Sequence, residues 1–166
     1  MAQADGGEAP RLARLQPHAG FSFEQIDVAD RAAVMYAGRI VAKADIAAEV
    51  TRLSSTILGK DPKVTALILQ RVEPEDWFAG GQSLAAADLA SFWLDIHITE
   101  GTNTKDEKAK FLAETFKTMG RLLGPLHEES YAHVHEVRGD AYGFGGLTQE
   151  RRYIAGKLAV PVAAAA

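Results

Sequence analysis

The chain has 166 residues, of which 47% are hydrophobic and 24% are charged, and its formal net charge is −4. This composition is typical of a globular protein in solution, and the small negative charge provides no basic surface for nucleic acid. The sequence contains no cysteine, which excludes disulfides, thiolate nucleophiles and cysteine-ligated metals.

Apolar runs, the first residues and the length of the chain predict its location and its domain organisation. No apolar run reaches the roughly 18–20 residues of a membrane span, and the first residues lack the basic start and apolar core of a secretory signal. We therefore expect a cytoplasmic protein without a membrane partner. The length suits one compact domain. We place an N-terminal extension, partly flexible, at residues 1–30, the domain at 31–155 and a tail at 156–166.

Two stretches of the chain share the same landmarks 65 residues apart. The first stretch contains Ile57, Leu58, Gly59, Val72, Trp77, Gly80 and Gly81, and the second contains Leu122, Leu123, Gly124, Val137, Tyr142, Gly145 and Gly146. This period is longer than the roughly 20–50 residues of solenoid repeats. We interpret it as a duplicated unit, with the two copies at about 31–88 and 91–155.

The first unit opens with an irregular segment. Residues 28–41 resemble a hairpin near the end of the nucleotide-binding subunit of peptide ABC transporters, and we predict short strands at 34–36 and 39–41 joined by a turn at Ala37 and Gly38. The chain has no glycine-rich phosphate loop, so we expect no ATPase activity.

A helix follows this segment in the first unit. It is ended by Gly59 and Pro62, and a strand is predicted after it over 64–72. The apolar stripe of the helix is formed by Ile46, Val50, Leu53 and Ile57.

The second unit has a clearer pattern. Alternating apolar residues over 92–98 predict a core strand, and Thr104 with Glu107 predicts a capping box that opens a helix. The helix is predicted to end at Gly124, before Pro125, and a second strand is predicted over 131–137. We expect its buried stripe to consist of Leu112, Phe116, Met119 and Leu123.

Each unit is therefore predicted to be a β-strand, a helix and a parallel β-strand, because a crossover of this length joins parallel strands. Two such units predict an α+β fold with a four-stranded mixed sheet and both helices on one face. The other sheet face is left bare, and a bare face requires a partner.

The run Asp95 to Gly101, followed by a helix, a strand and the ending Tyr142 to Gly146, resembles the tautomerase superfamily, typified by 4-oxalocrotonate tautomerase. The resemblance covers about residues 41–155 and is greatest to the fused, double-length members. It implies trimers or hexamers in which the sheets line a barrel, so we expect a homotrimer whose subunits cover the bare face.

The resemblance also implies a mechanism from which this sequence departs. Family members use an amino-terminal proline as general base and arginines that bind the carboxylates of a keto or enol acid. Residue 2 is Ala2 here, and the repeat distance places the opening of the first unit near Asp27 or Val28, where no proline stands. The family arginine positions correspond to Thr99, Thr102 and Tyr131. Dehalogenase and decarboxylase chemistry is therefore poorly supported.

A substitute base has to come from another side chain. His133 and His135 are two residues apart and share a strand face with Tyr131, which suits proton transfer near neutral pH as well as structural hydrogen bonding. Two histidines also raise the question of a metal, but no carboxylate stands at a convincing spacing, so we expect no metal and no cofactor. His97 suits either a core or a substrate-facing position.

The remaining candidates are aromatic residues and cations. Tyr142 and Trp77 stand in equivalent places before the paired glycines, where a family aromatic residue approaches the substrate or anchors an interface. Arg71 and Arg138 end the predicted unit strands, and a guanidinium can bind both oxygens of a carboxylate.

We therefore expect a tautomerase-like isomerase that moves a proton on a small substrate bearing a carboxylate. The predicted catalytic residues are His133, Tyr131 and Tyr142, and the predicted substrate-binding residues are Arg71, Arg138, Trp77 and His97. The alternative is a catalytically degenerate homologue that serves as a ligand-binding or structural oligomer.

Overall fold

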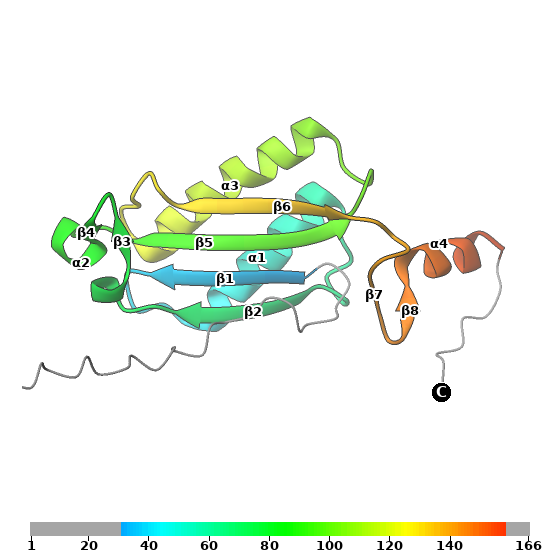
Figure 1. Cartoon of the computed structure of the whole chain (residues 1–166), viewed down its shortest axis with the longest axis horizontal. Coiled ribbons are helices and arrows are strands. Elements are labelled where there is room, and N and C mark those ends of the chain that lie inside the picture. Colours follow the sequence, from blue (N-terminus) through cyan, green and yellow to red (C-terminus); the bar gives the residue numbers. More distant parts are fainter. Residues whose placement is uncertain (1–30, 159–166) are drawn as a thin grey trace, which may run out of the picture.

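Four strands form one sheet at the centre of the molecule. The computed structural model describes residues 31–158. The sheet has the order β2-β1-β5-β6, with two parallel outer pairs and an antiparallel central pair of β1 and β5 (Figure 1). These strands are β1 (Arg31–Ala37), β2 (Ala66–Arg71), β5 (Ser91–Thr99) and β6 (Tyr131–Val137). The predicted mixed sheet of two β-α-β units is confirmed.

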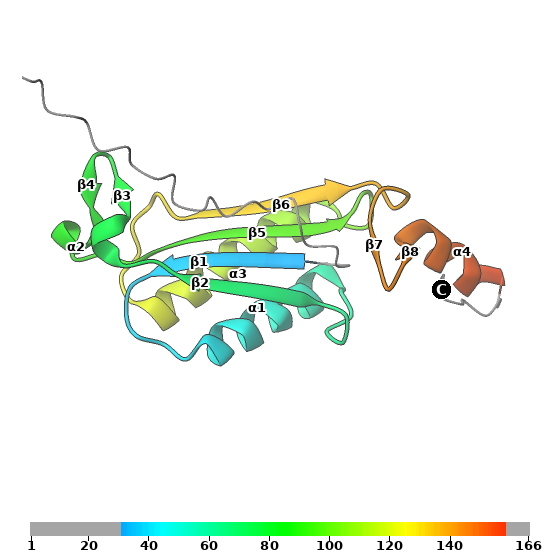
Figure 2. The ribbon, with the colours of Figure 1, turned by 60° about the horizontal axis from the view of Figure 1, so that its bottom comes forward.

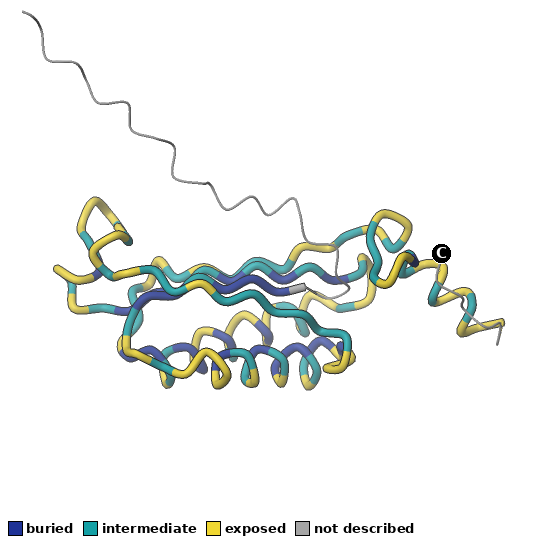
Figure 3. Tube along the Cα trace, turned by 90° about the horizontal axis from the view of Figure 1, so that it is seen from below, coloured by how far each residue is buried: buried dark blue, intermediate teal, exposed yellow. Residues whose placement is uncertain are grey.

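Helices α1 (Lys43–Leu58) and α3 (Lys105–Leu123) lie side by side on one face of this sheet (Figure 2). Their buried residues correspond one to one at a spacing of 65. In α1 these are Ile46, Val50, Leu53, Ser54 and Leu58, and in α3 they are Phe111, Thr115, Thr118, Met119 and Leu123. The internal repeat is thus a repeat of the packing, visible as the dark sheet-facing side of both helices (Figure 3).

The predicted stripe of α3 is wrong by one residue at its start. Leu112 and Phe116 are 37% and 41% exposed, whereas Phe111 and Thr115 are fully buried. Threonine carries a methyl group that packs on the core, but a count of apolar residues passes over it. The prediction, which used apolar residues alone, therefore placed the start of the buried stripe one position too far along the helix.

The predicted hairpin at the start of the first unit is also wrong. β1 is one strand that pairs with β2 on one side and β5 on the other, which leaves no free edge for a returning strand at 39–41. Instead, the Arg39 amide donates to the Leu123 carbonyl at 3.1 Å. Gly38 has φ +145° there, and a Cβ would lie 2.6 Å from the Ala90 Cβ. The chain therefore passes closely beneath the end of α3.

Strand register defines which residues of the two units are equivalent. Ala33 pairs with Ile68 in the first unit, and Asp95 pairs with His133 in the second. The opening strands and the first residues of the helices are thus offset by 62 residues, whereas the buried helix positions are offset by 65, because α3 has 19 residues and α1 has 16. Asp27 and Val28 lie outside the described residues.

The helix ends agree with their predicted signals. Thr104 and Glu107 form the reciprocal hydrogen bonds of a capping box at α3, whereas Ala42 at the start of α1 makes no side-chain cap. Gly59 follows α1 with φ 67°, a left-handed conformation that favours glycine. Gly124 follows α3.

Each unit continues into a short hairpin, and the two hairpins lie at opposite ends of the sheet (Figure 1). The paired glycines form both turns, with φ between 55° and 82°. The first unit continues with a 3-10 helix (Pro74–Asp76), β3 (Phe78–Ala79), β4 (Gln82–Ser83) and α2 (Leu84–Ala87). The second unit continues with β7 (Gly143–Phe144), β8 (Leu147–Thr148) and α4 (Gln149–Leu158).

The core lies between the sheet and the two long helices. Its largest fully buried side chains include Tyr36, Phe92, Ile96 and Phe111. None of the helices in residues 31–158 combines the length and the apolar character that crossing a bilayer requires.

Candidate functional site

Two neighbouring strands place polar and aromatic side chains on the sheet face opposite α1 and α3, the bare face, which no helix of residues 31–158 covers. Side chains alternate along a strand. In β5 the even-numbered residues from Phe92 to Ile98 are buried toward the helices. The odd-numbered residues of β5 and β6 therefore share the opposite face. They include Trp93, Asp95, His97, Tyr131, His133 and His135.

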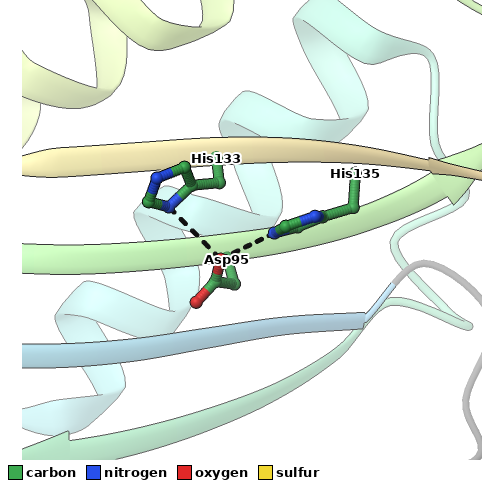
Figure 4. Close-up of side chains that lie close together, drawn as sticks. All are labelled: Asp95, His133 and His135. Atoms are coloured by element: carbon green, nitrogen blue, oxygen red, sulfur yellow. Dashed lines mark hydrogen bonds and ion pairs between the residues drawn. The ribbon is translucent and has the colours of Figure 1, made fainter.

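Three of these residues converge, and we refer to Asp95, His133 and His135 as the Asp95 cluster (Figure 4). The His135 Nε2 atom lies 2.7 Å from the Asp95 Oδ1 atom, within hydrogen-bond distance. The His133 Nδ1 atom lies 3.3 Å from the same oxygen. One carboxylate oxygen thus faces both imidazole rings.

The other oxygen of Asp95 is held by Trp93. The indole Nε1–H donates to Asp95 Oδ2 at 2.7 Å, and the Asp95 side chain is only 13% exposed. A buried carboxylate requires such partners, because its desolvation would otherwise be costly. Trp93 therefore fixes the orientation in which Oδ1 faces the histidines.

His133 is partly shielded, in a way that distinguishes its two nitrogens. Its ring is 38% exposed, but Nδ1 is closed off from solvent and has no hydrogen-bond partner among the described residues. The contact with Asp95 is therefore an ion-pair distance without hydrogen-bond geometry. The His133 ring is therefore exposed at its opposite edge, which carries Nε2.

Aromatic rings pack around the cluster. His133 lies 4.8 Å from Trp93 and 6.0 Å from Tyr131, and His135 stacks on His97 at 4.7 Å, all measured between ring centroids. The Tyr131 hydroxyl donates to the Glu129 carboxylate, and this hydrogen bond raises the pKa of Tyr131. The structure thus brings Tyr131 beside His133 and His97 beside His135, with the Tyr131 hydroxyl directed at Glu129.

The two remaining aromatic candidates lie away from the cluster. The hydroxyl groups of Tyr142 and Thr99 are 2.6 Å apart, near the C-terminal end of β5. Trp77 stands just before β3, and its carbonyl accepts a hydrogen bond from the Leu84 amide. They belong to the hairpin regions at the two opposite ends of the sheet (Figure 1).

The two candidate arginines are separated from the cluster and from one another. Arg71 lies on edge strand β2, in register with the buried Tyr36 and so on the helix side, and it pairs with Glu73. Arg138 lies five residues beyond His133, roughly 16 Å along an extended strand.

The surroundings of Arg138 are polar. Its guanidinium donates to Asp140 at 2.6 and 3.0 Å, which raises the pKa of Arg138 and lowers that of Asp140. Arg138 also lines an open hollow of about 740 Å³ together with Thr99 and Arg152. This hollow lies at the C-terminal ends of β5 and β6.

The sequence interpretation missed Asp95 as a site residue, although it noted the motif that contains it. Asp95 stands 38 residues before His133, and the register of β5 on β6 pairs them directly. The available signal was the alternation of β5, which places Asp95 on the face opposite the core. The reason given for expecting no metal, the lack of a carboxylate, therefore no longer holds.

Comparisons with known proteins agree with this fold. A sequence model of the family described as Tautomerase enzyme matches residues 41–87. No curated protein matches the chain significantly.

Solved structures resemble the chain over most of its length. A fused 4-OT symmetric trimer is 15% identical with a TM-score of 0.62, covering 74% of this chain and 98% of that one. Pt0534, inactivated by 2-oxo-3-pentynoate, is 14% identical with a TM-score of 0.62, covering 72% and 96%.

A third similar structure is N1, a member of the cis-3-chloroacrylic acid dehalogenase family. It is 18% identical with a TM-score of 0.60, covering 78% of this chain and 92% of its own. The chain thus shares the fold of these proteins, and its residues 41–87 match the tautomerase family model.

Proposed function

We propose that this protein is an isomerase that moves a proton between oxygen and carbon on a small 2-oxo carboxylic acid, at the Asp95 cluster. The substrate class is suggested by the similar fold of Pt0534, which 2-oxo-3-pentynoate inactivates. The chemistry is suggested by the paired imidazole and carboxylate groups on the bare sheet face.

One observation carries the proposal. His133 has its Nδ1 edge turned to Asp95 and its Nε2 edge toward solvent. A carboxylate beside Nδ1 favours the tautomer with the proton on Nδ1, which leaves a lone pair on Nε2. His133 thereby has the form of a general base.

The proton transfer can be written as one cycle. His133 Nε2 accepts the hydroxyl proton of an enol acid, and the electron pair of that O–H bond becomes the carbonyl π bond. The pair of the carbon–carbon double bond takes the proton back from the imidazolium at the adjacent carbon. Asp95 stabilises the transient positive charge on His133, and Trp93 holds Asp95 in place.

Binding of the substrate carboxylate requires a cation near the cluster. Neither Arg71 nor Arg138 reaches His133 within the same chain. Arg71 lies on β2, at the sheet edge opposite β6, and Arg138 lies roughly 16 Å from His133 along the direction of β6. The fused 4-OT relative is a trimer. We therefore propose a homotrimer in which a neighbouring subunit covers the bare face and contributes one of these arginines, with Tyr142 or Trp77 closing the pocket.

The test is ketonisation of phenylenolpyruvate, followed by its ultraviolet absorbance. We expect turnover by the full chain and a loss of at least about 100-fold in kcat/KM for His133→Ala, because a positioned general base contributes about 10²–10⁴-fold. His127→Ala is the matched control, since His127 lies outside the cluster and its Nδ1 accepts from the Glu129 amide. It should keep full activity.

A second variant separates loss of chemistry from loss of folding. Asp95→Ala, His133→Ile and His135→Gln together install the residues that the first unit carries at equivalent positions. This triple variant should fold and be inactive. An inactive wild-type chain, or an active triple variant, would contradict the proposal.

The alternative is a homologue that binds a ligand or assembles without catalysis. It is favoured by the arginines, because Arg71 and Arg138 both already pair with carboxylates of their own chain. Thermal unfolding with 2-oxo and dicarboxylic acids separates the two, because a ligand that binds the native state raises its stability. A rise in melting temperature without turnover would favour the alternative.

A further inference from the structure

We propose that the Asp95 cluster binds a divalent transition-metal ion, with Zn²⁺ as the best-suited species. The three donor atoms are Asp95 Oδ1, His133 Nδ1 and His135 Nε2, and all lie within 4.8 Å of one another. Two imidazoles and one carboxylate form a common zinc ligand set that leaves a further position open. This inference goes beyond the proposed function and does not depend on it.

Two of the three donor distances are close to those around a tetrahedral ion, and the two histidine donors lie within 4.8 Å of one another. With metal–ligand bonds of about 2.0–2.1 Å, neighbouring ligands of a tetrahedral zinc lie about 3.3 Å apart. The distance from His133 Nδ1 to Asp95 Oδ1 is 3.3 Å, and that from His135 Nε2 to the same oxygen is 2.7 Å. A modest rotation of the His135 ring, which is 46% exposed, opens the shorter distance.

His133 gives a second, independent indication. Its Nδ1 atom is shielded from solvent and makes no hydrogen bond with any described residue, although Asp95 Oδ1 lies close by. A buried polar atom is normally satisfied. A metal ion among the three donors would provide the missing partner and would replace the close approach of His135 to Asp95.

The surroundings hold the ligands as an outer shell does in metal sites. Trp93 donates to Asp95 Oδ2, which leaves Oδ1 for the metal, and His97 stacks on the His135 ring. All donors lie on paired strands, with Asp95 directly opposite His133. Such supporting contacts typically account for a 10–100-fold difference in metal affinity.

Metal binding and the proposed base exclude one another at His133. An imidazole that binds a metal through Nδ1 carries its proton on Nε2, so the exposed edge becomes a donor and cannot accept a proton. Zinc should therefore inhibit the turnover proposed above. Binding itself is measured without substrate, so failure of the metal proposal and failure of the isomerase proposal give different results.

The experiment uses the full chain, freed of metal with a chelator and titrated with ZnCl₂ by isothermal calorimetry. We expect one ion per chain, and a tetrahedral absorption spectrum when Co²⁺ replaces zinc. His133→Ala and His135→Ala should each weaken binding by at least about 100-fold. Trp93→Phe, which keeps the ring but removes the indole donor, should weaken it by about 10-fold.

A control addresses another histidine. His127→Ala should leave zinc affinity unchanged, and circular dichroism should show that every variant is folded. Absence of saturable binding up to about 100 µM zinc would overturn the proposal, as would undiminished binding after loss of both His133 and His135.

Discussion

The two units bury their helices in the same way but carry different side chains on the opposite face of the sheet. Toward the core, Ile46 corresponds to Phe111 and Leu58 to Leu123, and all four are buried. On the bare face, the strand register matches an alanine, an isoleucine and a glutamine of the first unit with an aspartate and two histidines of the second. The first unit has Ala33, Ile68 and Gln70 where the second has Asp95, His133 and His135.

The difference follows from what each face must do. Core positions have to fill a shared interior at high density, so both units retain residues that pack. The bare face of one chain has no such requirement, and its residues can diverge without loss of the fold. Among the described residues the cluster occurs in the second unit alone, which is the reason that we propose a function for that unit.

The first way to test the comparison is to remove equivalent core side chains. Phe111→Ala should lower the free energy of unfolding by about 3–5 kcal/mol and Ile46→Ala by about 2–5 kcal/mol, because each leaves a cavity at a fully buried site. Urea denaturation monitored by circular dichroism measures both. Equivalent packing predicts that the two losses are of similar size.

Leu112→Ala provides the control, since Leu112 is next to Phe111 but 37% exposed. Its loss should cost only about 1 kcal/mol, in line with the smaller apolar area that it buries. A cost for Leu112 as large as that for Phe111 would mean that α3 presents a different face to the sheet.

Much of this fold was predictable because several independent sequence signals agree. The repeat, the Thr104 capping box, Gly59 and Gly124 each mark an element end, and the alternation over 92–98 marks a central strand. The opening strand was mispredicted because Ala37 and Gly38 have the composition of a turn. Their conformation is decided instead by the close approach of Gly38 to the end of α3.

The site was predictable in part. His133 and His135 could be identified as sharing a face with Tyr131, because that follows from spacing within one strand. Asp95 could not be joined to them, because its position depends on the register between β5 and β6. Such long-range pairing is decided by packing of the whole sheet, which no local pattern contains.

A second test exploits the difference between the helix N-termini. Thr104→Ala should destabilise the protein by about 1 kcal/mol, because the Glu107 amide loses its side-chain acceptor. Ala42→Ser should have the opposite effect and stabilise by up to about 1 kcal/mol, since Ala42 already has an extended conformation and lacks a cap. Both are measured from urea midpoints. A neutral Ala42→Ser variant would show that the start of α1 differs in more than its cap.

The smallest expected effect concerns an ion pair that the second unit has and the first lacks. Lys108 Nζ donates to Glu136 at 2.7 Å, whereas the equivalent positions are Lys43 and Arg71, two cations. The hydrogen bond from Lys108, followed by that from the Gly101 amide, lowers the pKa of Glu136. A carboxylate with a lowered pKa in the folded state stabilises the protein above the ordinary glutamate pKa of about 4.3.

This contribution is lost as the pH falls through the lower pKa of the folded state, because the protonated carboxyl no longer attracts Lys108. Glu136→Gln should therefore be less stable than the wild type at pH 7, and the difference should shrink as the pH falls through the lowered pKa of Glu136. Glu114→Gln, which removes an exposed carboxylate 3.8 Å from Lys117, should show a weaker dependence. Urea midpoints at low ionic strength across this range measure both. A difference for Glu136→Gln that stays constant with pH would show that Glu136 acts by packing rather than by charge, and the ion pair would then not distinguish the two units.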